Sequence, residues 1–163
     1  MSTLPLPELL DSILILLTES YAGPPDPSAT WFIDNAPDSG VLGLLAGVDA
    51  EEASRSVDGS RQPGTTIASH AEHLRWSLSV VAAELRGEPY PTDWDESWQV
   101  TTVDPEEWDR LRRLLRSEYE NVSGAIKERT QLSGDLLNDT LALLPHAAYH
   151  LGNIRQMVER LRA

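Results

Sequence analysis

Residues 66–86 read TIASHAEHLRWSLSVVAAELR, and apolar side chains recur along them at steps of three and four residues. The members of this apolar set, which would share one face of a helix, are Ile67, Ala71, Leu74, Leu78, Val81 and Leu85. Gly87 and Pro89 follow directly, and both residue types commonly end helices. This stretch therefore predicts a long amphipathic helix.

The same spacing predicts two further long helices. Residues 6–21 carry leucine and isoleucine at helical intervals. Residues 104–107 read DPEE, in which an aspartate can cap a helix, proline suits its first turn and the glutamates suit the positive end of its dipole. We expect this helix to run to about Arg129. Its buried stripe would be Trp108, Leu111, Leu115, Val122 and Ile126.

A last helix follows the Ser133-Gly134 break and ends near Leu161, with a kink or a restart expected at Pro145. No stretch is typical of a β-strand. Four long helices joined by long loops predict an all-α protein with the architecture of a four-helix bundle. We expect one domain over residues 1–163.

Two long loops complete this organisation. Residues 22–40 are rich in Gly, Pro, Asp and Ser, and we expect Trp31 and Phe32 to hold them in place. The second loop covers residues 88–104, and the segment 88–109 contains eight acidic residues, no basic residue and three of the five tryptophans. We expect this crossover loop to fold back on the helices. Its Trp94 and Trp98 could roof a site, but plugging the end of the bundle is the favoured interpretation.

Composition excludes several classes of function. Thirteen Lys and Arg against 26 Asp and Glu give the 163-residue chain a net charge of −13. Nucleic acids and anionic membrane surfaces require clustered basic residues, so we expect neither as a partner. No apolar run approaches the roughly 20 residues of a membrane span, and no basic residues mark a signal peptide. Cysteine is absent, which excludes disulfides and thiolate metal sites. These features favour a cytoplasmic protein.

The four histidines form two pairs, His70 with His73 and His146 with His150. Two histidines four residues apart on a helix lie on one face and can bind the same metal ion. The surrounding sequence LLPHAAYHLGNIRQM (143–157) is largely apolar, so His146 and His150 are expected to face inward. A third ligand would come from a facing helix, and the spacing leaves open whether that ligand is His70 or His73.

Residues 66–98 and 143–157 resemble the DinB/YfiT-like superfamily of metal-binding four-helix bundles. The resemblance covers about residues 41–157, and the H-x-x-Y-H-x-G-x-I-R pattern of residues 146–155 is its most specific part. It implies a divalent metal ion held by His73, His146 and His150, with zinc or nickel favoured and iron or manganese as alternatives. The chain departs from the family at Asn153, where glutamine is usual, and in the longer loop around Trp31.

Three more residues were candidates for roles near this site. His70 would either lie behind the metal ligands or be a partly exposed histidine bonded to solvent, and His70→Ala is expected to retain the metal. Tyr149 could point its hydroxyl into a cleft, although packing between helices is favoured. Arg155 could hold an anionic substrate, but a surface ion pair with an acid such as Glu159 is the default interpretation.

The resemblance implies a metal-dependent enzyme, such as a transferase of low-molecular-weight thiols. A small-molecule substrate, possibly such a thiol, is the expected partner, and the acidic crossover loop is expected to stand away from the entrance so that it does not repel an anionic thiol. The alternative is a non-catalytic, stress-associated metal-binding bundle that forms a homodimer. The sequence contains no Ser-His-Asp pattern or glycine-rich phosphate loop that would supply other chemistry.

Overall fold

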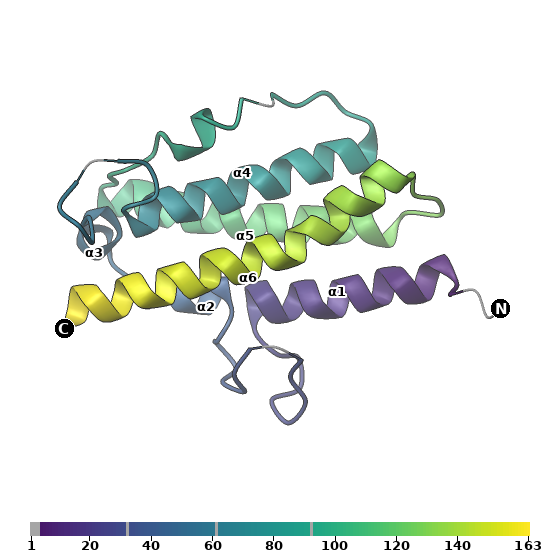
Figure 1. Ribbon diagram of the computed structural model, residues 1–163, viewed down its shortest axis with the longest axis horizontal. Helices are drawn as coiled ribbons and strands as arrows, with labels where there is room; N and C mark the ends of the chain where they lie inside the picture. Colours follow the sequence, from purple (N-terminus) through teal and green to yellow (C-terminus); the bar gives the residue numbers. More distant parts are fainter. Residues whose placement is uncertain (1–3, 32, 61, 92) are drawn as a thin grey trace.

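The computed structural model describes residues 4–31, 33–60, 62–91 and 93–163, and this part of the chain contains helices and no β-strand. The α-helices are α1 (Leu6–Ala22), α2 (Val41–Ala46), α3 (Ala50–Ser54), α4 (Ile67–Arg86), α5 (Pro105–Lys127) and α6 (Gly134–Arg162), and a short 3-10 helix, η1, covers Glu96–Trp98 (Figure 1). The expected all-α class is confirmed. Within the same residues, no helix has both the length and the apolar character needed to cross a membrane.

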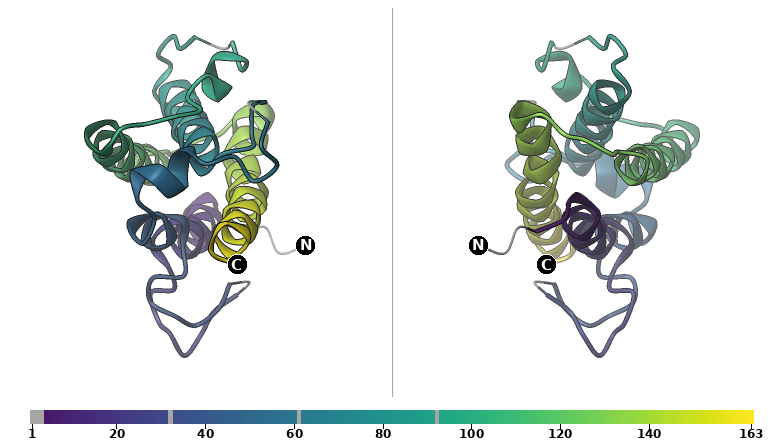
Figure 2. Two further views of the ribbon diagram at one scale, coloured as in Figure 1. Left: turned by 90° about the vertical axis from the view of Figure 1, so that its left-hand side faces the viewer. Right: turned by 90° about the vertical axis from the view of Figure 1, so that its right-hand side faces the viewer.

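The four long helices pack around a common core. Helix α4 contacts α5 and α6, and α1 contacts the same two helices on its own side, which gives the arrangement seen end-on in Figure 2. Each long helix contributes fully buried apolar side chains, such as Leu17, Leu74, Leu115 and Ile154. Burial of one such side chain stabilises the fold by about 1.5–3 kcal/mol. The short helices α2 and α3 cover the ends of α1 and α4.

Side chains at the helix starts explain where the long helices begin. Thr66 accepts a hydrogen bond from the backbone N–H of Ser69 at the start of α4. Asp104 and Glu107 form a reciprocal capping box at the start of α5, which confirms the start expected from the DPEE sequence. At the other end of α4, Gly87 has a φ of 70°, a conformation that favours glycine. The expected buried stripe of α5 is also confirmed.

Helix α6 is a single continuous helix that includes Pro145 (Figure 1). The expectation of a restart at this proline is therefore wrong. A proline inside a helix removes one backbone N–H donor, but the neighbouring turns remain helical on both sides. This continuity places His146 and His150 one turn apart on the same helix.

The loop that follows α1 is anchored by a buried carboxylate. Glu19 is 1% exposed and accepts hydrogen bonds from the backbone N–H groups of Trp31, at 2.9 and 3.0 Å, and Ile33, at 3.0 Å. Trp31 itself is 73% exposed, so it does not hold the loop by packing, and Phe32 lies outside the described residues. Because the backbone N–H groups of this loop bind the Glu19 carboxylate on α1, the role expected for Trp31 is wrong.

Candidate metal centre

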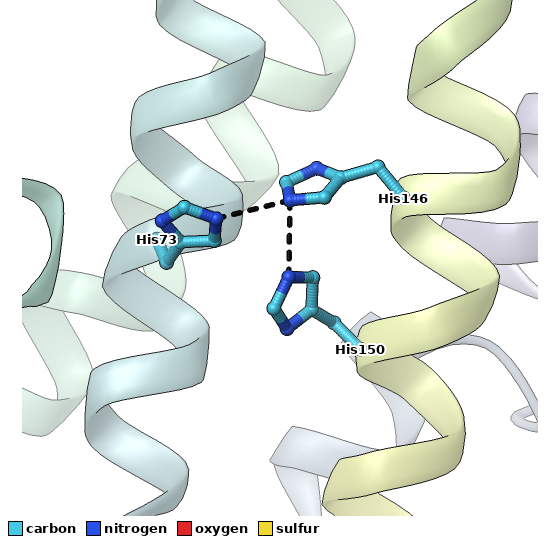
Figure 3. A group of neighbouring side chains, drawn as sticks. All are labelled: His73, His146 and His150. Carbon is cyan, nitrogen blue, oxygen red and sulfur yellow. Dashed lines mark hydrogen bonds between the residues drawn. The ribbon is translucent and has the colours of Figure 1, made fainter. Parts of the chain in front are cut away.

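Three imidazole rings converge in the space between α4 and α6. His73 comes from α4, while His146 and His150 come from α6, and the rings point toward one another (Figure 3). The Nε2 atom of His146 lies 3.0 Å from Nε2 of His73 and 3.0 Å from Nε2 of His150. One ligand atom from each ring lies within 4.8 Å of the others. The three histidines expected to come together do so, and they can hold a metal ion.

Hydrogen bonds on the far side of two rings show which nitrogen carries the proton. His73 Nδ1 lies 2.7 Å from the hydroxyl of Ser97, which donates its single proton to the backbone oxygen of Trp94 at 2.6 Å. The serine must then accept from His73 Nδ1–H. His146 Nδ1 makes the same kind of contact with Ser77, at 3.1 Å, and Ser77 donates to a backbone oxygen of α4. Neutral His73 and His146 therefore have unprotonated Nε2 atoms.

His70 fixes the third ring by the same logic. Its Nε2 lies 3.0 Å from the backbone oxygen of Gly64, which can only accept, so Nε2 carries the proton. The Nδ1 atom of neutral His70 then accepts from His150 Nδ1–H, 2.7 Å away. His150 Nε2 is left unprotonated. His70 is 4% exposed and lies behind a candidate ligand, so the interpretation as a solvent-bonded histidine is wrong.

With these tautomers the three Nε2 atoms are unprotonated, and the 3.0 Å contacts drawn between them in Figure 3 contain no donor. Lone pairs in this arrangement repel, and a bound cation would satisfy all three. Histidines that bind metals commonly donate their other ring N–H to an oxygen or another acceptor, which fixes the ring and raises its basicity. Ser97, Ser77 and His70 supply these acceptors. The three ring nitrogens therefore fit a divalent metal ion, because they lie close together and because neutral imidazole nitrogens are suitable metal ligands.

Burial keeps the four rings neutral at ordinary pH. Desolvation is the largest effect on each histidine. Together with the smaller effects of His146 and then His70, it lowers the pKa of His73 to about 4. The pKa of His150 is lowered still more by burial and by its three histidine neighbours. Burial also lowers the pKa values of His70 and His146. Neutral imidazoles are the form that binds metal ions.

The crossover loop covers the candidate site. Trp98 stacks on the ring of His73 with a centroid distance of 3.9 Å and an interplanar angle of 17°. Trp94 also lies near His73, with centroids 5.9 Å apart. Trp98 therefore roofs the site, and the favoured expectation that it plugs the bundle end is wrong. The loop also does not stand away from the entrance, although its carboxylates at Asp95 and Glu96 are exposed and absent from the cleft walls.

Two clefts open beside the histidines. The first has a volume of about 710 Å³, and its walls include His70, Trp98, Tyr149, Asn153, Gln156 and Arg160. The second has a volume of about 390 Å³ and contains Glu84 and Asp139. His73 and His146 line both clefts. The candidate metal centre therefore lies where two binding spaces meet, one with a basic side chain and one with two acidic side chains.

Arg155 and Tyr149 are two further residues near the site whose expected roles can be compared with the structure. Arg155 forms an ion pair with Asp34 at 2.9 Å and donates to the backbone oxygen of Ser39 at 2.6 Å. The favoured interpretation, a surface ion pair with an acid, is therefore confirmed, with Asp34 as the partner in place of Glu159. Arg155 fastens the 23–40 loop to α6 and lies outside both clefts. Tyr149 is 65% exposed and lines the first cleft, so it does not pack between helices.

Several residues of the site were missed at the level of sequence. Ser77 lies one turn after His73, and Arg160 lies on the face of α6 reached from His150 by steps of three and four, so helical spacing could have found both. Ser97 gave no such signal because it reaches His73 from a loop. Its position depends on how the chain crosses over α4.

Comparisons of the chain with protein-family models, with curated proteins and with solved structures found no match. The function is therefore argued from the geometry and chemistry of this site.

Proposed function

We propose that the protein is a metal-dependent enzyme of the DinB/YfiT-like four-helix-bundle type, which transfers a low-molecular-weight thiol to an electrophile. The divalent ion would be held by the Nε2 atoms of His73, His146 and His150. The observation that carries this proposal is the convergence of three histidine Nε2 atoms at the junction of two clefts. A purely structural metal would have no need of clefts on both sides.

Imidazole ligands limit the choice of metal. Three neutral nitrogens suit zinc, nickel, iron, copper or manganese, and we expect zinc or nickel. Catalytic zinc sites commonly have three protein ligands and keep one position open. A divalent ion bound here would favour the thiolate form of a thiol and polarise an electrophile.

The residues around the ligands orient and shield the site. His70, Ser77 and Ser97 fix the three rings through their Nδ1 atoms. Trp98 covers the face of His73 and excludes water from it. In the first cleft, Arg160 can pair with a carboxylate of the thiol, which is the role that the sequence had suggested for Arg155.

The proposed reaction joins the two clefts. A thiol from the first cleft loses its proton to solvent, its sulfur forms a bond to an electrophilic carbon in the second cleft, and the leaving group departs with the electron pair of its broken bond. With an aryl chloride the products are a thioether, chloride and a proton. The chain itself contains no cysteine that could serve as the nucleophile.

A calorimetric titration of metal-loaded and metal-free protein with glutathione, mycothiol and bacillithiol tests this proposal. We expect one of these thiols to bind only the metal-loaded protein, and to be conjugated to an aryl chloride. His150→Ala should abolish both effects, whereas Gln131→Ala, a control at an exposed position that lines neither cleft, should retain thiol binding. Metal binding without thiol binding would contradict the transferase and leave the non-catalytic metal-binding bundle as the better account.

A further inference from the structure

The second cleft has the features of a binding site for an organic cation. It lies between α4 and α6 and begins at His73 and His146. Its apolar walls are formed by Val80, Val81, Ala142, Leu143 and Trp94. The cleft volume of about 390 Å³ suits a small molecule.

Two carboxylates face this cleft without a basic partner. Glu84 comes from α4 and Asp139 from α6, and both are exposed at the edge of the cleft. No basic side chain is among the described residues that line the cleft. The ion pairs of residues 4–31, 33–60, 62–91 and 93–163 do not include either carboxylate. Partial desolvation by the cleft, followed by the negative charge of Asp139, raises the pKa of Glu84. A cation placed between the two carboxylates would relieve their repulsion.

The carboxylates lie at a defined distance from the candidate metal centre. Asp139 precedes His146 by seven residues, or two turns of α6, which corresponds to about 10 Å along the helix axis. Glu84 follows His73 by eleven residues, or three turns of α4, so it lies on the same face of that helix. Val80, Val81 and Leu143 occupy the positions between these ends.

We propose that this cleft binds an apolar molecule with an ammonium group at one end, which sits between Glu84 and Asp139 while the apolar end points toward His73 and His146. Trp94 can add a cation–π contact or pack on the apolar part. The opposite orientation is disfavoured, because a divalent ion at the histidines would repel the ammonium group. An inorganic cation would not use the apolar walls, since Ca²⁺ and Mg²⁺ bind through oxygen ligands.

This inference rests on the proposed function in one respect, because it takes the cationic molecule to be the electrophile that reacts with the thiol. Binding itself does not depend on the metal. The first cleft contains Arg160 and the second contains Glu84 and Asp139, so the two spaces select molecules of opposite charge. This difference would keep the two substrates from occupying the same cleft.

The test compares three ligands of similar shape that differ in charge: phenylbutylamine, phenylbutanol and phenylpentanoate. Binding is measured by calorimetry, and the cleft is identified by the NMR signal of the Trp94 indole N–H, assigned with Trp94→Phe. We expect the amine to bind on the order of tenfold more tightly than the alcohol, the carboxylate to bind weakest, and the Trp94 signal to shift. Equal affinities of the amine and the alcohol, or an unshifted Trp94 signal, would overturn the proposal.

Charge-matched variants provide the control. The double variant Glu84→Gln/Asp139→Asn should lose the preference for the amine over the alcohol. Asp11→Asn/Glu120→Gln removes two likewise exposed carboxylates that do not line the cleft and should keep it. An equal loss in both double variants would show that net charge, and not the cleft, selects the amine. If the amine binds but no thiol binds even the metal-loaded protein, the transferase is refuted and this site stands. If the thiol is transferred but the amine does not bind, only this site is refuted.

Discussion

His70→Ala is expected to weaken metal binding by about 10- to 100-fold without abolishing it. His70 contributes no atom to the converging Nε2 group, but its Nδ1 accepts the Nδ1–H proton of His150 at 2.7 Å. His70 is itself held in place because its Nε2–H donates a hydrogen bond to the backbone oxygen of Gly64 at 3.0 Å. Alanine removes this acceptor, so the His150 ring can rotate or change tautomer.

The expected loss corresponds to about 1.4–2.7 kcal/mol of metal-binding free energy, since each factor of ten is 1.4 kcal/mol. Zinc affinity is measured by competition with a chromophoric chelator at neutral pH. His70→Gln is the matched variant, because its amide has an acceptor for His150 Nδ1–H and a donor for the Gly64 oxygen. It should recover a large part of the affinity.

The reasoning fails if His70→Ala binds zinc as tightly as the unmodified chain, because the hydrogen bond to His150 would then have no effect on the ligands. It also fails if the Gln and Ala variants are equally weak. A complete loss of metal in His70→Ala would instead identify His70 as a ligand. Circular dichroism of each variant checks that the helices are retained.

Three other predictions concern the loop, the first cleft and acid stability. Glu19→Ala leaves the backbone N–H groups of the 23–40 loop without their acceptor, a loss of about 1–3 kcal/mol that should lower Tm by several degrees, whereas exposed Glu8 can be replaced without effect. Arg160→Ala should weaken thiol binding, while Arg155→Ala should lower Tm and leave thiol affinity unchanged. Because burial lowers the pKa of His73 to about 4, the metal-free protein should be fully stable above about pH 6.5 and lose stability as the pH falls from there toward 4.

These three outcomes are checked by thermal melts, calorimetry and urea unfolding. For the acid effect, the unfolded chain takes up protons first, so each buried histidine contributes a decline of at most about 1.4 kcal/mol per pH unit. His73→Gln should flatten this part of the pH profile. A pH profile that is unchanged by His73→Gln would contradict the acid-stability prediction. Thiol affinity that depends on Arg155 and not on Arg160 would contradict the prediction for the first cleft, and equal Tm values of the Glu19 and Glu8 variants would contradict the prediction for the loop.

Local signals predicted the helices well, because each helix is largely specified by its own residues. The apolar period of residues 66–86 with the terminating Gly87, and the capping residue Asp104, place α4 and α5 as observed. The continuity of α6 could not be predicted from Pro145. Packing of α6 against α1 and α4 stabilises the turns on both sides of the missing N–H donor, and that packing is a tertiary property.

The candidate ligands were predictable in part. Spacing alone gave His146 and His150, but it left the choice between His70 and His73 open until the family resemblance was considered. Two of the groups that orient the rings come from distant parts of the chain, Ser97 beside His73 and His70 beside His150, and the Gly64 oxygen that holds His70 lies in a loop. Contacts of this kind depend on loop paths that have no sequence period. The role expected for Trp31 and the ion-pair partner expected for Arg155 were wrong for the same reason.

The metal content of the reconstituted protein tests the central claim most directly. Untagged protein, purified without a nickel column, is loaded with zinc, dialysed and analysed by elemental mass spectrometry, alongside His73→Ala, His146→Ala and His150→Ala. We predict about one zinc ion per chain for the unmodified protein and close to none for each variant, because each Nε2 atom is one of only three ligands from the chain. An unmodified protein that retains no zinc, or a zinc content that survives all three substitutions, would contradict the proposed metal site.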